Sequence, residues 1–268
     1  MVGAMPTIAV VTGAARGLGK SIAAALAGRG HEVLVTDLDG EAAAATAAAI
    51  GKGAWAMAHD VRDPASHRAV AAAATGRGPL AVWVNNAGVL QVGPGWETRE
   101  ADVRRMVEVN VLGVMWGSQT AVAAMPRGGH LINIASLSAL VPAPGFAVYA
   151  ATKHAVLGFT TALAGDLRRA RIPIHAAAIC PDAVETDMVR QVADHSASDL
   201  LFSAGTLLTP DAVAAAVLAQ LDRPRLVRVL PATRGVLAHA LSPFPEVGLR
   251  LLERFAAVGA RRKRQRAG

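Results

Sequence analysis

A tyrosine and a lysine stand four positions apart in the segment "YAATK", Tyr149 to Lys153, which has the residue pattern of a helix. Side chains at positions i and i+4 lie on the same helix face, so the phenol and the ammonium can approach each other. A nearby positive charge favours the phenolate over the phenol. Such a pair suits proton exchange with an alcohol, although a solvated helix surface can carry the same two residues.

Two further observations favour the catalytic interpretation. Tyr149 is the only tyrosine in the 268 residues, and Ser136 comes before it at the end of a predicted strand, "GHLINIAS" (129–136). Ligands of open α/β sheets bind at the carboxyl ends of strands, where a serine hydroxyl can hold a substrate oxygen. Ser138 is the alternative for that role. We therefore expect Tyr149 to be the general acid and base, Lys153 the cation that lowers its pKa, and Ser136 the ligand of the substrate oxygen.

A glycine-rich turn, "VTGAARGLG", connects a short apolar strand (7–13) to a helical segment (19–30). Glycines at such a turn let the backbone approach a pyrophosphate, and the helix amino terminus offers N–H groups and partial positive charge. The spacing is G-xxx-G-x-G, which differs from the commoner G-x-G-xx-G. The residues predicted to bind a dinucleotide here are Gly13, Arg16, Gly17, Leu18 and Gly19.

Asp37 ends the second predicted strand, "HEVLVTD" (31–37). A carboxylate at this place can bind the ribose hydroxyls and repels a 2′-phosphate, which favours NAD over NADP. Arg16 is the opposing signal, because its guanidinium can attract that phosphate. The alternative for Asp37 is a turn or cap residue in "TDLDGE". We expect Asp37 to bind the ribose and the cofactor to be NAD, with NADP less favoured.

The elements that must position these residues alternate between strand and helix. Strands are predicted at 7–13, 31–37, 54–60, 80–88, 129–136, 173–181 and 225–231, and helices at 19–30, 41–50, 65–75, 99–125, 149–170 and 211–221. This alternation predicts a parallel sheet covered on both faces. We expect an α/β fold with a single doubly wound Rossmann-type domain over residues 1–231, a mostly parallel seven-stranded sheet, and a C-terminal helical extension over 232–268 that is not a separate domain.

Composition is that of a globular protein, with 53% hydrophobic and 18% charged residues. The net charge of +7 owes five positive side chains to residues 261–266, so it describes a tail more than a nucleic-acid-binding face. The sequence has a single cysteine, Cys180, no apolar run of about 18 residues and no signal-peptide pattern. We expect a cytoplasmic protein, and we see no cluster of histidines and cysteines that predicts a metal site.

Several motifs occur together in one order: "TGAARGLG", Asp60, "NNAG" (85–88), Asn110, Ser136 and the Tyr149-x-x-x-Lys153 pair. In this combination, residues 7–231 resemble the short-chain dehydrogenase/reductase family. The resemblance implies a Rossmann-type fold, a nicotinamide cofactor, and oxidation of an alcohol or reduction of a carbonyl. It also implies a homo-oligomer, a dimer or a tetramer, whose faces are the helices at 99–125 and 149–170.

The same resemblance implies roles for individual residues. In the family pattern the catalytic set is Asn110, Ser136, Tyr149 and Lys153. Asn110 would hold a water that links Lys153 to solvent, and Lys153 would also bind the nicotinamide ribose. Residues implied to contact other parts of the cofactor are Asp60 and Val61 at the adenine, Asn86, Ala87 and Gly88 at the adenosine, and Pro181 and Thr186 at the nicotinamide.

Asp182 departs from the family pattern, which has glycine after Pro181. We expect its side chain to narrow or polarise the mouth of the pocket. The following loop, 183–210, is apolar in its second half (Leu200, Leu201, Phe202, Leu207 and Leu208), and further apolar residues flank the predicted site (Leu137, Leu140, Val141 and Phe146). These residues favour a small-molecule substrate that is a lipophilic secondary alcohol or ketone, steroid-like or acyl-chain-like, or else they simply pack the loop onto the body.

The C-terminal extension has an apolar stripe at helical spacing, formed by Val247, Leu251, Phe255 and Val258 with Leu252 beside it. We favour a helix packed on the body or on a neighbouring subunit, followed by a disordered tail. The alternative is an interfacial helix attracted to anionic lipid. The competing function for the whole chain is a non-catalytic dinucleotide sensor or scaffold, and Asp182 is the residue that favours it.

Overall fold

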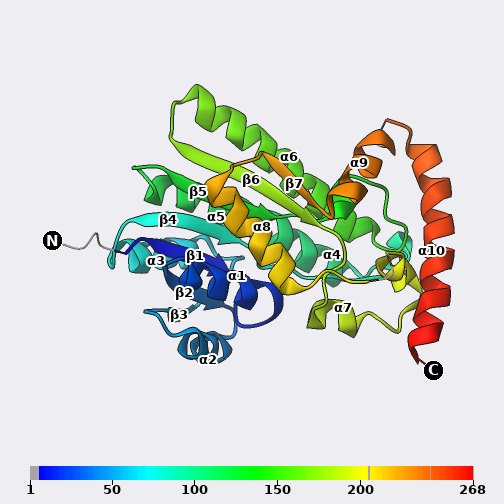
Figure 1. Ribbon diagram of the computed structural model, residues 1–268, viewed down its shortest axis with the longest axis horizontal. Coiled ribbons are helices and arrows are strands. Elements are labelled where there is room, and N and C mark those ends of the chain that lie inside the picture. Colours follow the sequence, from blue (N-terminus) through cyan, green and yellow to red (C-terminus); the bar gives the residue numbers. More distant parts are fainter. Residues whose placement is uncertain (1–5, 205, 242, 268) are drawn as a thin grey trace.

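The structure, a computed structural model, describes residues 6–204, 206–241 and 243–267. Its centre is a seven-stranded sheet in the order β3-β2-β1-β4-β5-β6-β7, in which every pair of neighbouring strands is parallel (Figure 1). The strands are β1 (Ile8–Thr12), β2 (Glu32–Asp37), β3 (Trp55–Ala58), β4 (Leu80–Asn85), β5 (Gly129–Ile134), β6 (Ile174–Pro181) and β7 (Val227–Leu230).

Helices follow most strands and cover the sheet on both faces (Figure 1). The α-helices are α1 (Gly17–Gly28), α2 (Gly40–Ile50), α3 (Pro64–Thr75), α4 (Glu100–Val107), α5 (Gly113–Ala124), α6 (Ala147–Arg169), α7 (Asp187–Gln191), α8 (Pro210–Asp222), α9 (Ala232–Leu241) and α10 (Pro245–Ala267). Short 3-10 turns are η1 (Gly95–Glu97), η3 (Leu137–Ala139) and η4 (Ser196–Phe202), and η2 (Glu108–Leu112) is a π-helical turn.

Several helices begin where the local sequence supplies a cap. Asp63 accepts a hydrogen bond from the Ala65 N–H at 2.8 Å, and a proline follows it at the first position of α3. Thr209 caps α8 in the same way through the Ala212 N–H at 3.2 Å, again with a proline next. A capping side chain satisfies one of the free N–H groups of the first turn, and proline there loses no hydrogen bond.

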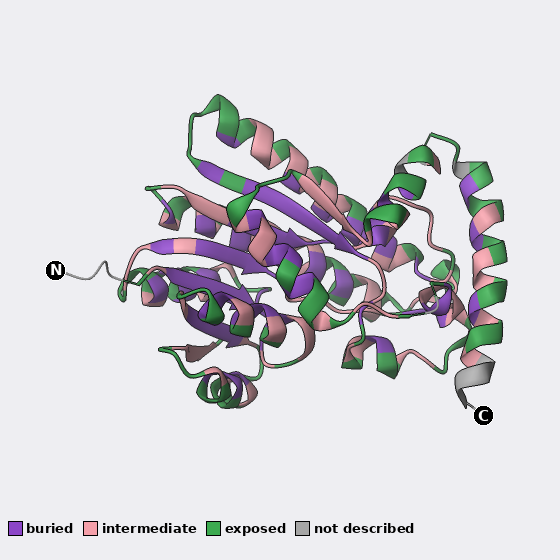
Figure 2. Cartoon of the chain, in the orientation of Figure 1, coloured by how far each residue is buried: buried purple, intermediate pink, exposed green. Residues whose placement is uncertain are grey.

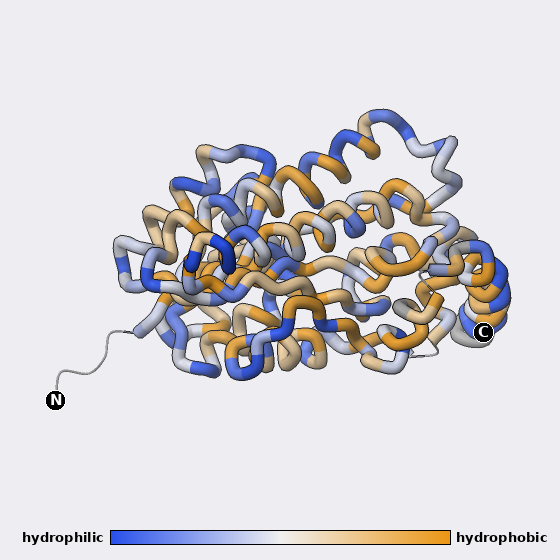
Figure 3. Tube along the Cα trace, turned by 90° about the horizontal axis from the view of Figure 1, so that it is seen from above, coloured by the Kyte–Doolittle hydropathy of each residue, from blue (hydrophilic) through white to orange (hydrophobic). Residues whose placement is uncertain are grey.

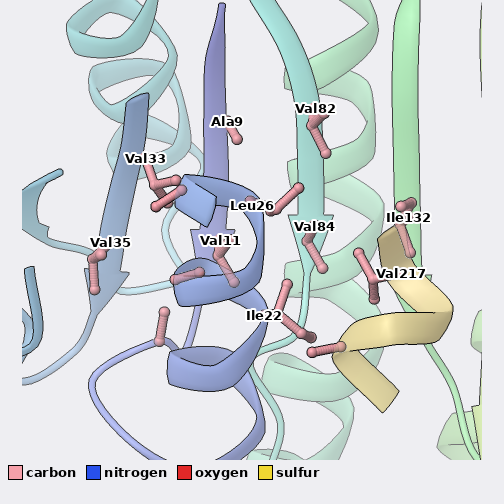
Figure 4. Close-up of a cluster of buried hydrophobic side chains, with 14 of the residues drawn as sticks. Ala9, Val11, Ile22, Leu26, Val33, Val35, Val82, Val84, Ile132 and Val217 are labelled. Atoms are coloured by element: carbon pink, nitrogen blue, oxygen red, sulfur yellow. The ribbon is translucent and has the colours of Figure 1, made fainter. Parts of the chain in front are cut away.

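Alternate residues of each buried strand pack on opposite faces of the sheet. Ala9 and Val11 of β1 face α1 and α8, together with the apolar side chains of the neighbouring strands (Figure 4). Ile8 and Val10 face the layer of α3, α5 and α6. All five β1 residues are buried, as expected for a central strand covered on both sides. The burial map shows the same layering, with the sheet buried and the outer helix faces exposed (Figure 2).

The strand order reverses between β1 and β4, and this reversal places the site. The chain proceeds from β1 outward to β2 and β3, then returns to the other side of β1 with β4. Gly13 after β1 and Ala87 after β4 are therefore in contact at the carboxyl edge of the sheet. Such a switch point is where open α/β sheets bind ligands.

The C-terminal extension runs across the carboxyl-edge end of the sheet (Figure 1). The predicted stripe on α10 is wrong in part, because Val247 and Val258 are 54% and 39% exposed. The buried residues of α10 instead include Gly248, Leu252 and Gly259. The two glycines have no side chain, which allows close packing of this helix on the body. Figure 3, coloured by hydropathy, shows that α10 carries both hydrophobic and hydrophilic residues.

The prediction of a disordered basic tail is also wrong over the described residues, because α10 continues to Ala267. Arg262 donates to the Ser203 carbonyl at 2.6 Å. Lys263 donates to the His195 carbonyl at 2.9 Å and lies 3.3 Å from the Asp199 carboxylate. These bonds attach the start of the basic run to η4. Within the part of the chain that the structure describes, no helix is long and apolar enough to cross a membrane.

The predicted strands and helices are found within a few residues of their expected bounds, and the seven-stranded α/β fold is confirmed. The main difference lies in the helix expected at 99–125. It is interrupted by the π-helical turn of η2, which contains Asn110. Turns of this kind often occur at functional sites.

Candidate active site

One cavity of about 580 Å³ runs along the carboxyl edge of the sheet. It brings together fifteen of the residues predicted to bind the cofactor and all but one of the residues predicted to be catalytic. The predicted residues that line it are Gly13, Arg16, Gly17, Leu18, Gly19, Asp37, Asp60, Val61, Asn86, Ala87, Gly88, Ser136, Tyr149, Lys153, Pro181 and Thr186. Asn110 is fully buried behind the wall.

The glycine turn has a backbone path that other residues would obstruct. Gly13 has a φ of +62°, and a Cβ there would lie 2.7 Å from the Ala87 Cα. A Cβ on Gly19 would lie 2.5 Å from the Asn86 Nδ2. The first turn of α1 has no side-chain cap and no acidic residue, so its N–H groups and its positive dipole end suit a pyrophosphate. Asn86 donates to the carbonyls of Thr12 and Gly13 at 2.9 Å and holds the turn against β4.

Asp37 lies at the end of β2 with its carboxylate turned towards the glycine turn. Its Oδ2 accepts a hydrogen bond from the Ala15 N–H at 3.0 Å, and its Oδ1 accepts one from the Asp39 N–H at 3.3 Å. Leu38 beside it is 67% exposed and brings no positive charge. The fixed carboxylate therefore places negative charge beside the glycine turn, while Arg16 is an exposed residue of that turn.

Asp60 and Val61 follow β3 at the far end of the cavity. The Asp60 carboxylate receives the Arg62 Nη2 at 2.7 Å and the Arg62 backbone N–H at 2.9 Å. These bonds to Arg62 lower the pKa of Asp60, so the group is a carboxylate at neutral pH. Val61 is buried against Gly113, where a Cβ would lie 3.0 Å from the valine Cγ2.

The predicted catalytic hydroxyls are connected. The Ser138 hydroxyl donates to the Ser136 Oγ at 2.9 Å. Burial raises the pKa of Tyr149 to about 12, and its hydrogen bond with Ser136 acts in the opposite direction. A phenolate in a poorly solvated place is costly, so burial by itself favours the protonated phenol. The lowering of the tyrosine pKa by Lys153 stays a prediction.

Lys153 is buried one turn along α6, with its Nζ 5.6 Å from the centroid of the Tyr149 ring. The ammonium donates to the Ile134 carbonyl at 2.9 Å. Burial lowers the pKa of Lys153 to about 8, because removing the ammonium from water disfavours its charged form. The fold thus keeps the Lys153 ammonium beside the phenol, although burial of this charge is energetically unfavourable.

Asn110 supports this arrangement from the π-helical turn. Its Oδ1 accepts from the Val89 N–H at 2.8 Å, and its Nδ2 donates to the Val89 carbonyl at 2.9 Å and to the Thr152 hydroxyl at 3.2 Å. The amide therefore connects the β4 loop to α6 one residue before Lys153. The water-holding role implied by the family stays a prediction.

Arg234 on α9 and Leu252 on α10 are among the residues of the cavity wall that sequence reasoning missed. The Arg234 Nε lies 3.4 Å from the Asp182 Oδ2, and the two side chains are only 20% and 16% exposed. Burial raises the pKa of Asp182, and Arg234 acts against that rise. The Asp182 Oδ1 accepts from its neighbour Ala183 at 2.9 Å. Asp182 thus lines the cavity and also holds the C-terminal extension through its ion pair with Arg234. No feature of the sequence predicted this pair.

This fold, with its glycine turn at the strand-order switch, defines a Rossmann-type dinucleotide-binding protein. A family model described as short chain dehydrogenase matches residues 7–197. A 3-beta-hydroxysteroid dehydrogenase of Comamonas testosteroni is 37% identical over 185 residues, which are 68% of this chain and 73% of that protein. A 1-deoxy-11-beta-hydroxypentalenate dehydrogenase of Streptomyces avermitilis is 37% identical over 194 residues, or 69% and 71% of the two chains.

Solved structures agree with these matches. A short chain dehydrogenase/reductase from Burkholderia phymatum in complex with NAD superposes with a TM-score of 0.82 at 26% identity, covering 92% of this chain and 96% of that one. A 3-ketoacyl-(acyl-carrier-protein) reductase from Brucella melitensis complexed with NADH has a TM-score of 0.76 at 29% identity, covering 85% and 98%. The chain belongs to the short-chain dehydrogenase/reductase family of NAD(P)-dependent oxidoreductases that act on CH–OH groups.

Proposed function

We propose that this protein is an NAD-dependent oxidoreductase that interconverts an apolar secondary alcohol and its ketone, with Tyr149 as general acid and base. The observation that carries the proposal is one cavity lined by Ser136, Tyr149 and Lys153 together with the glycine turn. In that cavity a hydroxyl, a phenol and an ammonium converge beside a surface suited to a dinucleotide.

Each side chain has a distinct task in alcohol oxidation. When bound, NAD⁺ would supply the hydride acceptor and a positive charge. The Ser136 hydroxyl binds the substrate oxygen, and Tyr149 accepts the alcohol proton as the carbonyl forms. Moving the tyrosine pKa from about 12 towards neutrality requires positive charge nearby, which Lys153 and the oxidised cofactor supply. In ketone reduction the phenol returns its proton to the substrate oxygen.

The choice of NAD over NADP rests on Asp37. Its carboxylate is fixed by two backbone N–H groups, and a 2′-phosphate beside it would meet like charge. The bound NAD and NADH named for the two solved relatives support this choice. Arg16 is exposed and lies in the turn, where it can approach the pyrophosphate.

The substrate part of the cavity favours an apolar molecule. Its walls come from the β4 and β5 loops, η4 and α10, and the apolar lining residues are Leu90, Leu137, Val141, Phe146, Leu200, Leu201 and Leu252. The hydroxysteroid and hydroxypentalenate in the names of two relatives support the same class. Because the Asp182 carboxylate is paired with Arg234, its charge gives no reason to prefer a non-catalytic sensor.

We further propose that the protein acts as a cytoplasmic homo-oligomer. The support is the family membership and the helices α4, α5 and α6, which supply the subunit faces in the family. Sedimentation of the purified protein tests the oligomeric state, and a monomer at micromolar concentration would contradict it.

The test of the enzymatic proposal compares wild type with Tyr149→Phe on a panel of apolar secondary alcohols. The phenyl ring keeps the packing of the site and removes the proton acceptor. We expect turnover, followed by NADH absorbance, to fall by about 100-fold or more, because general acid–base catalysis contributes that much. NADH affinity, measured by fluorescence, should stay close to that of wild type. Full turnover by the phenylalanine variant would refute the role of Tyr149.

A further inference from the structure

Two buried histidines lie at the end of the cavity where Asp60 and Val61 are placed, His59 in the lining and His67 behind it. His59 and His67 are 2% and 0% exposed, and their rings meet edge to face with centroids 4.5 Å apart. His59 follows β3, and His67 lies one turn into α3. The roles proposed above for Ser136, Tyr149 and Lys153 use neither of them.

A continuous chain of hydrogen bonds runs through the pair. Thr36 Oγ1 lies 3.0 Å from His59 Nδ1, His59 Nε2 lies 3.2 Å from His67 Nδ1, and His67 Nε2 lies 2.9 Å from the Val61 carbonyl oxygen. A carbonyl can only accept, so His67 donates from Nε2 and, as a neutral ring, accepts at Nδ1. His59 must then donate from Nε2 and accept at Nδ1 from the Thr36 hydroxyl, which lies 3.0 Å from this nitrogen and 3.3 Å from its other acceptor, the Val11 carbonyl. The Val61 carbonyl, at one end of this chain of hydrogen bonds, thus fixes the tautomer of both rings.

The chain of hydrogen bonds ends at a peptide group that is also hydrogen-bonded to the Asp60 carboxylate. The peptide between Val61 and Arg62 offers its carbonyl to His67 and donates its N–H to the Asp60 Oδ1 at 2.9 Å. Holding the carbonyl fixes the peptide plane, and the plane in turn fixes the direction of the N–H that orients Asp60. The Arg62 side chain also holds the carboxylate, from Nε to Oδ1 at 2.9 Å and from Nη2 to Oδ2 at 2.7 Å, so the imidazoles act through the peptide together with this guanidinium.

We propose that His59 and His67 are positioning residues that aim the Asp60 carboxylate at the exocyclic amino group of the cofactor's adenine. This inference rests on the proposed NAD-dependent function and on the placement of the adenine at Asp60 that the family resemblance implies. An amino group donates to a carboxylate, whereas the carbonyl oxygen of hypoxanthine at the same ring position accepts and would be repelled. The pair therefore makes the enzyme selective for the adenine base.

Electrostatics keeps the pair neutral. Burial lowers the pKa of His59 to about 3, with the neighbouring His67 acting in the same direction, while Asp60 and Asp63 act against the shift. Burial also lowers the pKa of His67, with the bond to Val61 and the same two carboxylates opposing it. Neutral rings preserve the donor directions derived above throughout the physiological pH range.

The test measures the affinities of NAD and of its hypoxanthine analogue by calorimetry for wild type and His67→Leu. We expect wild type to prefer NAD by about 10-fold, the worth of one charge-assisted hydrogen bond. In His67→Leu the preference should fall towards unity, and in His67→Gln, whose amide can still donate to the Val61 carbonyl, it should return in part. His31→Leu, which removes a histidine hydrogen-bonded to Thr7 at 2.8 Å away from the cavity lining, is the matched control.

A preference for NAD that persists unchanged in folded His67→Leu would overturn the inference. Wild type that binds neither nucleotide would instead defeat the proposed function. If the leucine variant does not fold, histidine ¹⁵N spectra of the wild-type protein decide the matter. Two rings that stay in the neutral Nε2–H form from pH 7 to 5, and whose signals shift with NAD more than with the analogue, support the role. Rings that titrate near pH 6.5 contradict it.

Discussion

Replacing Lys153 by methionine should stabilise the nucleotide-free protein while removing its activity. The ammonium is 4% exposed, and its only protein acceptor described is the Ile134 carbonyl. Burial lowers its pKa from 10.5 to about 8. At 1.36 kcal/mol for each pKa unit, burial of the charged lysine lowers the free energy of unfolding by about 3 kcal/mol. Methionine has a similar length and carries no charge, so it avoids that cost.

The sign of the pH dependence follows from linkage. Between pH 8 and 10.5 the folded lysine has lost its proton while the unfolded lysine retains it, so wild-type stability rises with pH by about 1.4 kcal/mol per unit. Below pH 8 the lysine is protonated in both the folded and the unfolded state, so burial of its charge lowers the free energy of unfolding by the full amount. The advantage of Lys153→Met should therefore be about 3 kcal/mol at pH 7 and should vanish near pH 10.5.

Urea denaturation followed by circular dichroism at pH 7 and pH 10 measures this difference. Tyr149 and Cys180 also titrate in alkali, but both proteins contain them, so their contributions largely cancel in the comparison. Lys20→Met, at an exposed lysine of α1, is the control and should change stability little. A Lys153→Met protein that is less stable than wild type at pH 7, or whose advantage is the same at both pH values, would refute the reasoning.

Two further substitutions address the cofactor and the extension. Asp37→Ala should raise the NADP affinity relative to NAD by about 10-fold or more, because it removes like charge beside the 2′-phosphate; an unchanged ratio of dissociation constants would argue against the ribose role. Asp182→Gly should lower the free energy of unfolding by about 2 kcal/mol because it leaves Arg234 without its carboxylate. The double variant Asp182→Gly/Arg234→Leu should recover most of that loss in thermal unfolding, and simple additivity of the two changes would count against the pairing.

Local features of the sequence were sufficient to predict that the glycine turn, Asp37 and Asp60 line one cavity. The glycine turn, Asp37 and Asp60 each lie within a few residues of a strand end, and parallel strands bring their carboxyl ends to one edge. Once the alternation of strands and helices is established, the meeting of these residues follows from topology. The same reasoning placed Ser136 and Tyr149 in one cavity, because one follows β5 and the other begins α6.

Other features depend on contacts between distant residues. Arg234 pairs with Asp182 across more than fifty positions, and no periodicity connects them. The buried line of α10 is marked by Gly248 and Gly259, which an apolar stripe does not detect, so its orientation was predicted wrongly. The π-helical turn at Asn110 also has no periodic signal.

The close packing of α10 on η4 has a consequence for how this enzyme can acquire new substrates. Gly259 lies against the Asp199 carbonyl, and Leu252 of the same helix lines the cavity. This wall comes after residue 197, where the match to the family model ends. Mutations on the inner side of the last helix therefore reshape the space for the reacting molecule and leave the hydride and proton machinery intact, so the C-terminus can diverge for specificity while the Rossmann core stays constant.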